Sequence, residues 1–172
     1  MIKAKNLTFS YRGKEQIFRD LSLSIERGRI CGLLGANGIG KSTLTLQTIL
    51  GLPDRKILYV SGEESAHQLK MRAERIYKTG ASNGTLPDDS SLDSLYILCE
   101  TSLETIFEHI KTVQPEIVVV DSIQTIATED ADSSPGSITQ VRECASALLR
   151  FAKSSSIPVI LIGHINKEGS LA

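Results

Sequence analysis

The nine residues from Gly35 to Thr43 constrain the fold more than any other part of this sequence. They read Gly-Ala-Asn-Gly-Ile-Gly-Lys-Ser-Thr and fit the pattern G-x-x-x-x-G-K-[ST]. An apolar run at 30–34 precedes them, and a helical pattern follows from Lys41 to Gly51. A strand before the motif and a helix after it are the context that distinguishes a phosphate-binding loop from a chance glycine-rich turn.

Each residue type in this loop suits a triphosphate. The glycines let consecutive backbone amides turn toward one phosphate, and the following helix presents its positive end at the same place. Lys41 is expected to reach the β- and γ-phosphates, Ser42 to give Mg²⁺ an oxygen ligand, and Thr43 to contact the α-phosphate. The predicted cofactors are ATP and Mg²⁺, and the binding set in the loop is Gly35, Asn37, Gly38, Ile39, Gly40, Lys41, Ser42 and Thr43.

Acidic residues follow two other predicted strands. Asp121 comes after the apolar run 117–120, where an acid holds Mg²⁺ through a water molecule in such sites. Glu63 and Glu64 follow the run 56–61 at the same expected edge of the sheet. We expect one of them to activate the attacking water and the other to be a solvated neighbour, and we favour Glu63 as catalytic base. The alternatives are a turn-capping Asp and acids that offset a helix dipole.

Two further residues stand at strand ends. His164 ends the last predicted strand, and the expected strand order puts that strand between those of the phosphate loop and Asp121. This places His164 near the γ-phosphate as a catalytic sensor, with a structural histidine as the alternative. Tyr11 ends the first predicted strand, and its ring suits either stacking on adenine or half-buried packing.

Strands and helices alternate along most of the chain, which favours right-handed βαβ crossovers and a mostly parallel sheet. Residues 2–11 and 17–25 flank a turn and predict an N-terminal antiparallel hairpin. The predicted fold is a three-layer α/β P-loop domain spanning residues 1–172. The other predicted strands are 30–34, 56–61, 95–99, 117–121 and 158–163, and the other predicted helices are 65–77, 101–113 and a long helix from 137.

Three helix starts carry capping-box patterns, in which the first and fourth side chains satisfy free amides of the first turn. They are Ser65 with Gln68, Thr101 with Glu104, and Ser137 with Gln140. Two polar stretches, 79–94 and the acidic 127–136, are expected to be flexible connections.

Composition excludes several classes of protein. A chain of 172 residues with 41% hydrophobic residues forms one compact domain. Its net charge of -1 gives no general attraction to polyanions, so we expect weak DNA binding and no membrane binding. Cys31, Cys99 and Cys144 are widely spaced, which argues against a zinc site. There is no signal peptide and no apolar run of about 18 residues, so we expect a cytoplasmic protein.

Residues 1 to about 50 resemble the start of an ABC transporter nucleotide-binding domain. The resemblance is carried by Ile2-Lys3-Ala4-Lys5-Asn6-Leu7-Thr8-Phe9-Ser10-Tyr11, by Phe18-Arg19-Asp20-Leu21-Ser22-Leu23-Ser24-Ile25, by Gly28 and by Gly35-Ala36-Asn37-Gly38. It implies that Tyr11 stacks on adenine. The family's Leu-Ser-Gly-Gly-Gln signature, its Q-loop and its helical subdomain are missing, so we do not expect transport coupling.

Residues from about 55 to 172 instead resemble the RecA-like core of the RadA/Sms family of DNA-repair ATPases. The resemblance is carried by Ile57-Leu58-Tyr59-Val60-Ser61-Gly62-Glu63-Glu64-Ser65, Val120-Asp121-Ser122-Ile123-Gln124-Thr125, Pro135-Gly136-Ser137, Gln140-Val141-Arg142-Glu143-Cys144 and Gly163-His164-Ile165-Asn166-Lys167-Glu168-Gly169. It implies that Glu63 is the catalytic base. Both segments share the phosphate loop, so the chain resembles an engineered chimera of two P-loop families.

Three functions follow from these patterns. The leading hypothesis is an ATP-binding domain with weak or no hydrolysis, because both resembled families complete their active sites with groups from a neighbouring subunit. The second is a DNA-dependent ATPase that retains RadA-like repair activity. The third is a purely structural recombination of two folds. Self-association is expected if the shortened RecA-like part exposes apolar surface.

Overall fold

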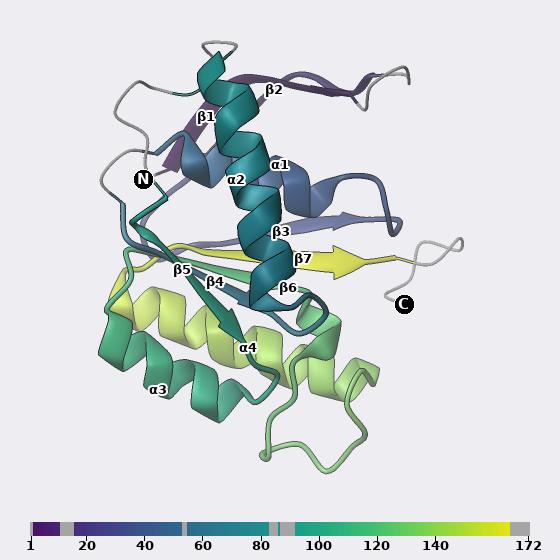
Figure 1. Cartoon of the computed structure of the whole chain (residues 1–172). Coiled ribbons are helices and arrows are strands. Elements are labelled where there is room, and N and C mark those ends of the chain that lie inside the picture. The colour runs from purple at the N-terminus through teal and green to yellow at the C-terminus, as the bar shows by residue number, and fades with distance from the viewer. Residues whose placement is uncertain (1, 11–15, 53–54, 83–85, 87–91, 166–172) are drawn as a thin grey trace.

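The computed structural model describes residues 2–10, 16–52, 55–82, 86 and 92–165 (Figure 1). It contains a five-stranded sheet in the order β3-β7-β6-β4-β5, and every pair of neighbouring strands in this sheet is parallel. The strands are β3 (Ile30–Gly35), β4 (Ile57–Ser61), β5 (Leu95–Cys99), β6 (Ile117–Asp121) and β7 (Val159–His164). The helices are α1 (Lys41–Leu50), α2 (Ala66–Ser82), α3 (Leu103–Val113), the 3-10 turn η1 (Ile123–Thr125) and α4 (Ile138–Ser155). The predicted mostly parallel α/β fold is confirmed.

The N-terminal residues form a separate two-stranded antiparallel sheet, as predicted. β1 (Ile2–Ser10) pairs with β2 (Gln16–Ile25), and Ile2 lies opposite Ile25 at the start of the register. Both of these isoleucines are buried in the hydrophobic cluster under α1 and α2. The hairpin is therefore attached to the main domain through its open end.

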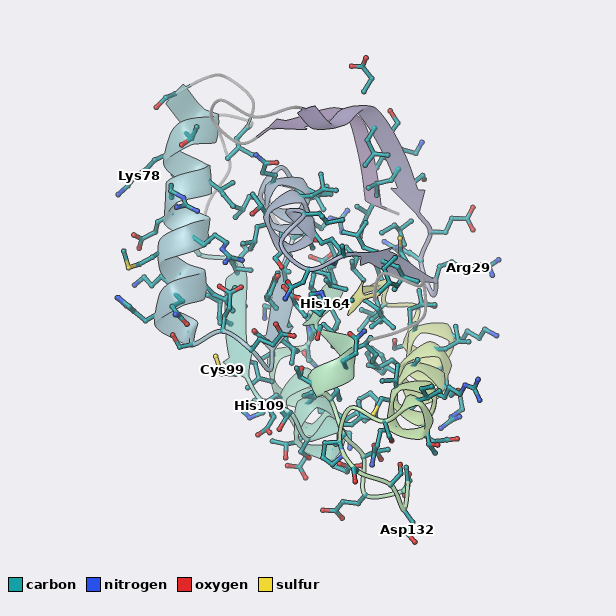
Figure 2. The ribbon with its side chains drawn as sticks, turned by 90° about the vertical axis from the view of Figure 1, so that its right-hand side faces the viewer. Arg29, Lys78, Cys99, His109, Asp132 and His164 are labelled. Atoms are coloured by element: carbon teal, nitrogen blue, oxygen red, sulfur yellow. The ribbon has the colours of Figure 1, made fainter. Side chains whose placement is uncertain are left out.

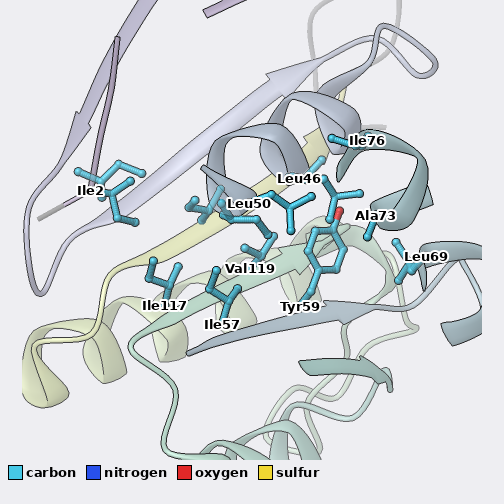
Figure 3. Close-up of a cluster of buried hydrophobic side chains, with 14 of the residues drawn as sticks. Ile2, Leu46, Leu50, Ile57, Tyr59, Leu69, Ala73, Ile76, Ile117 and Val119 are labelled. Carbon is cyan, nitrogen blue, oxygen red and sulfur yellow. The ribbon is translucent and has the colours of Figure 1, made fainter. Parts of the chain in front are cut away.

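Alternating side chains of the sheet build two hydrophobic layers. Ile57, Tyr59 and Val119 pack against α1 and α2, whereas Leu58 and Val118 pack against α3 and α4 (Figures 1 and 3). Strands β4 and β6 are buried along their whole length, because a parallel sheet covered by helices has no solvated face. The structure is thus the three-layer arrangement that the sequence predicts.

Two helices begin or end elsewhere than the sequence predicts. Helix α2 continues to Ser82 rather than fading near Tyr77. Helix α3 is capped by Ser102, whose hydroxyl accepts a hydrogen bond from the Thr105 amide, so the predicted Thr101–Glu104 box is wrong by one position. The Glu100 carboxylate instead accepts hydrogen bonds from the amides of residues 101 and 102. The predicted box forms in full at Ser65, and at Ser137 only its first half forms, the bond from the Gln140 amide to the Ser137 hydroxyl.

One buried side chain bonds to several points of the acidic connection 127–136, for which the sequence analysis expected only a flexible loop. Gln140 of α4 is 3% exposed, and its amide oxygen accepts a hydrogen bond from the Thr128 amide at 2.9 Å. Its amide nitrogen lies within hydrogen-bond distance of the carbonyl oxygens of Thr128, Ala131 and Ser133. Gln140 therefore acts on the loop and not on the Ser137 amide, which a full capping box would require. Among the residues described here, no helix is long and apolar enough to cross a membrane.

Candidate functional site

Four parallel strands end at one edge of the sheet and bring the predicted site residues together. Gly35 of β3 lies beside His164 of β7, and Ser61 of β4 lies beside Asp121 of β6. β7 lies between β3 and β6, as the sequence analysis expected. His164 lies toward the middle of the molecule with its side chain 17% exposed, whereas Arg29 and Asp132 point outward (Figure 2).

A cavity of about 300 Å³ opens at this carboxyl edge. Residues from the phosphate loop form one wall, and residues from the ends of β4, β6 and β7 and from α2 form the others. The lining residues are Asn37, Gly38, Gly40, Lys41, Ser42, Thr43, Ser61, Glu63, Glu64, Arg72, Arg75, Asp121 and His164. In parallel α/β sheets, ligands bind at this edge, where the helices also begin.

The phosphate loop has the backbone that its glycines predict. Gly38 has φ of 77° and Gly40 has φ of 91°, a left-handed region in which a Cβ is strained. A Cβ on Gly35 would lie 2.5 Å from the Ile39 side chain, so the loop closes tightly on itself there. Gly35 and Ile39 shape the loop without lining the cavity.

Lys41 is buried at the start of α1, with 3% of its surface exposed. Its Nζ donates hydrogen bonds to the carbonyl oxygens of Gly35 and Ala36, each at 2.7 Å. Burial lowers the pKa of Lys41, and the charges of Asp121 and Glu63 oppose that shift. The lysine is thus held at the mouth of its own loop, facing two carboxylates.

Asp121 is buried at the end of β6, and a tyrosine fixes one of its oxygens. The Tyr59 hydroxyl donates a hydrogen bond to Asp121 Oδ2 at 2.6 Å. Burial and the charge of Asp121 raise the pKa of Tyr59 well above its usual value. Sequence analysis missed Tyr59, because a tyrosine between apolar strand residues is typical of a core position.

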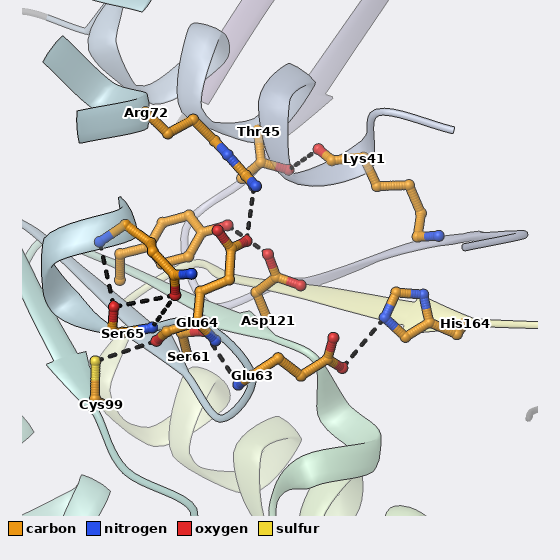
Figure 4. A network of polar contacts seen from close by, with 12 residues as sticks. Lys41, Thr45, Ser61, Glu63, Glu64, Ser65, Arg72, Cys99, Asp121 and His164 are labelled. Atoms are coloured by element: carbon orange, nitrogen blue, oxygen red, sulfur yellow. Dashed lines mark hydrogen bonds and ion pairs between the residues drawn. The ribbon is translucent and has the colours of Figure 1, made fainter. Parts of the chain in front are cut away.

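Glu63 and His164 both line the cavity, and their side chains point toward each other (Figure 4). Glu63 Oε1 lies 3.4 Å from His164 Nε2, a contact that is an ion pair when the ring is protonated. Among the described residues, neither ring nitrogen of His164 has a hydrogen-bond partner. Ser122 Oγ donates a hydrogen bond to Glu63 Oε1 at 2.7 Å, and Gln124 Nε2 donates one to the His164 carbonyl.

Glu64 is not the solvated neighbour that the sequence analysis expected. Its carboxylate forms an ion pair with Arg72 of α2 at 2.7 Å, with both side chains less than a third exposed. Arg75, three residues further along the helix, also lines the cavity. Sequence analysis missed both arginines, although their spacing places them on one helix face.

The residues present fit a magnesium ion bound together with phosphates. Asp121 and Ser42 line the same cavity, and the Tyr59 hydroxyl holds one oxygen of Asp121. Mg²⁺ beside a nucleotide takes only one or two protein ligands, with phosphate oxygens and water completing its shell. The described residues contain no cluster of three or more His, Cys, Asp or Glu side chains that would hold a metal without a phosphate.

The structure brings together most of the predicted site residues, and their roles stay predictions. Glu63, Asp121 and His164 converge on the loop residues Asn37, Gly38, Gly40, Lys41, Ser42 and Thr43. Tyr11, predicted to stack on adenine, lies outside the residues that the structure describes.

Comparison with known proteins gives one family and a consistent set of relatives. Residues 21–170 match the AAA domain family. The chain is 46% identical over 140 residues to the DNA repair protein RadA of Listeria monocytogenes, covering 80% of this chain and 28% of the relative. It is 44% identical over 161 residues to the DNA repair protein RadA of Pseudomonas aeruginosa, covering 93% of this chain and 33% of the relative. The chain thus spans about a third of the length of these relatives.

Two solved structures share the fold. The KaiC-like protein PH0186 of Pyrococcus horikoshii OT3 aligns with a TM-score of 0.60 at 20% identity, over 84% of this chain and 64% of that one. A DnaB-like replicative helicase, solved with its primase interactions, aligns with a TM-score of 0.66 at 14% identity, over 84% of this chain and 40% of that one. At these identities the likeness establishes the RecA-like fold alone.

Proposed function

Because this chain belongs to the AAA domain family, we propose that it binds Mg-ATP in the carboxyl-edge cavity and hydrolyses it weakly or not at all. One observation carries the proposal. The phosphate loop, a buried lysine and a buried aspartate from three separate elements meet at one cavity. A chance glycine-rich turn would have no reason to face an acid 80 residues further along the chain.

Binding uses the loop and the start of α1. The backbone amides near Gly38 and Gly40 surround the β-phosphate, and the helix N-terminus adds positive charge. Lys41 exchanges its hydrogen bonds with the loop carbonyls for the β- and γ-phosphate oxygens. Ser42 would be a direct ligand of Mg²⁺, and Asp121 would hold the ion through a water molecule.

Hydrolysis would depend on Glu63. Its carboxylate accepts a proton from the attacking water, and the hydrogen bond from Ser122 orients it for that task. His164 lies close enough to Glu63 that a contact between the histidine and the γ-phosphate would also affect the position of the base. Slow turnover is expected because P-loop ATPases gain much of their rate from an arginine supplied by a partner.

A DNA-dependent ATPase is the second candidate. The relatives bear the name DNA repair protein, so the expectation of weak DNA binding has no support from them. The acidic connection 127–136 still argues against strong attraction to a phosphate backbone. Stimulation of phosphate release by single-stranded DNA, falling as salt rises, would favour this second function.

We also propose that residues 1–172 form one nucleotide-binding domain. The origin of residues 1–50 in an ABC-type protein stays a prediction that the comparisons do not support. A RadA relative aligns over 93% of this chain, so similarity to that protein continues across residue 50. Self-association likewise stays a prediction.

Equilibrium binding of a fluorescent ATP analogue tests the proposed function. Lys41→Ala should weaken binding by about 100-fold or more, because a buried cation that contacts two phosphates is lost. Lys70→Ala, which removes an exposed lysine of α2, is the matched control and should bind like the wild type. Undiminished affinity in the Lys41 variant would refute the proposal.

A melting series separates the proposed function from a purely structural recombination of folds. A ligand that binds only the folded state raises the melting temperature. We expect Mg-ATP to raise it in the wild type and to leave it unchanged in Lys41→Ala. A wild-type protein that melts cooperatively with no shift would favour the structural alternative.

A further inference from the structure

Tyr59 carries a hydroxyl at a position where packing of the core requires only an aromatic ring. It lies in the middle of β4 with none of its surface exposed, and it packs with apolar residues of α1 and α2 (Figure 3). Phenylalanine would fill the same volume without a polar atom. Burying a hydroxyl is costly unless it is hydrogen-bonded, so its partner indicates its purpose.

The partner is a predicted magnesium ligand. Tyr59 donates to Asp121 Oδ2 across neighbouring strands, between residues 62 positions apart in the sequence. This bond occupies one carboxylate oxygen and leaves Oδ1 as the one available toward the cavity. A carboxylate fixed in this way cannot rotate freely about its last torsion.

Ser42, the other predicted magnesium ligand, lines the same cavity from the start of α1. Tyr59 is not among the residues that line this cavity. Its hydroxyl therefore reaches the predicted magnesium site through Asp121.

We propose that the Tyr59 hydroxyl is a positioning group that fixes the Asp121 carboxylate for Mg²⁺. The inference rests on the proposed binding of Mg-ATP and deepens it. Tyr59 does not touch the metal or the nucleotide. It acts through Asp121, as outer hydrogen bonds to metal ligands commonly do.

The test is a magnesium titration of the binding of a fluorescent ATP analogue to the full chain. Tyr59→Phe should require about ten-fold more Mg²⁺ than the wild type, the lower end of the loss usual for a supporting hydrogen bond. With EDTA in place of Mg²⁺, the two proteins should bind the analogue about equally well, since the loop and Lys41 are unchanged. A role in core packing alone would weaken both measurements equally and would contradict the proposal.

Two comparisons make the result specific. Tyr96→Phe removes the hydroxyl of a half-exposed tyrosine on β5, away from the cavity, and should leave the magnesium midpoint unchanged. In an Asp121→Asn background, Tyr59→Phe should add no further loss, because the partner through which it acts is already altered. Additive losses would overturn the inference.

The possible failures are distinguishable. A wild-type protein that binds no Mg-ATP contradicts the proposed function and, with it, this inference. A wild-type protein that binds, beside a Tyr59→Phe variant with the same magnesium midpoint, contradicts only the role of Tyr59. A Tyr59→Phe variant that unfolds while Asp121→Asn folds would assign the hydroxyl to stability and overturn the inference as well.

Discussion

The two edges of the parallel sheet carry cavities of similar size, about 300 Å³ at the carboxyl edge and about 260 Å³ at the amino edge. At the carboxyl edge the helices begin, and at the amino edge α1, α3 and α4 end. Helix N-termini favour anions and helix C-termini favour cations. Volume alone therefore does not distinguish the cavities. The helix ends do, because N-termini surround one cavity and C-termini the other.

Two basic side chains at the amino edge already have partners. Arg55 and Glu116 form an exposed ion pair, and Lys56 Nζ donates to the Val113 carbonyl at the end of α3. Burial opposes the shift, but hydrogen bonds from Arg55 and the Lys56 backbone, with the charges of Arg55 and Arg27, lower the pKa of Glu116. Arg55 is thus engaged by a carboxylate and Lys56 by a helix end.

The charges at the carboxyl edge are arranged differently. Lys41 is bonded to carbonyl oxygens of its own loop, and Glu63 is held by a serine beside a histidine. These groups are buried or half-buried around a common space rather than paired on the surface. The comparison teaches that charged side chains gathered around a common space at the helix starts mark the functional edge.

Removing one carboxylate from each edge should give the largest contrast. Glu63→Gln should lower whatever phosphate release the wild type shows by about 100-fold, because a general base contributes at least that much. ATP binding should stay nearly unchanged. Glu116→Gln is the matched change at the amino edge, and it should leave phosphate release unaltered. Equal rates of phosphate release in the two variants, measured in a single-turnover assay, would contradict the role of Glu63 as catalytic base.

Adding one methyl group at each edge sharpens the comparison. Gly38→Ala forces a side chain into the left-handed region at a cost of roughly 1–2 kcal/mol, so ATP affinity should fall about ten-fold. Gly51→Ala, where φ is -80°, meets only ordinary contacts and should change affinity little. Calorimetric titration of both variants measures the difference. Wild-type affinity in the Gly38→Ala variant would mean that the loop conformation is not needed for binding.

Two of the three histidines, His164 and His109, offer a smaller effect. His164→Ala should slow phosphate release several-fold through Glu63, a smaller loss than that of the base itself, while leaving ATP binding nearly unchanged. His109→Ala, an exposed change on α3, is the control. If His164→Ala weakened ATP binding and did not slow phosphate release, His164 would have a structural role.

The amino-edge ion pair should give the smallest effect. Arg55→Ala should lower stability by roughly 0.2–1 kcal/mol, the usual range for an exposed pair, without changing ATP affinity. Because the pKa of Glu116 is lowered in the folded protein, the pair stabilises at neutral pH and its contribution disappears as pH falls through that lowered pKa. Denaturant melts at neutral and acid pH measure this. If the difference in stability between the wild type and Arg55→Ala stayed the same at acid pH, the effect would not come from the pair with Glu116.

The sequence predicted the sheet better than it predicted the polar partners. The runs 95–99 and 117–121 match β5 and β6 end to end, because short apolar segments between turn residues have no other place in this fold. Capping at Ser102 was missed since two adjacent hydroxyl residues, at 101 and 102, offer the same local signal.

Contacts between distant segments could not be predicted from the sequence. Tyr59 is typical of a core residue until β4 is set beside β6, and Gln140 is typical of a helix start until its side chain is seen against residues 128–133. Glu64 is expected to be solvated until α2 brings Arg72 over it. In each case the partner depends on the tertiary fold and not on local spacing.

A crystal structure with a non-hydrolysable ATP analogue and Mg²⁺ tests the central claim most directly. The triphosphate should lie in the loop 35–43, with Lys41 Nζ turned from the carbonyls of Gly35 and Ala36 to the β- and γ-phosphates. A triphosphate bound at the amino edge beside Arg55, or at neither edge, would contradict the account.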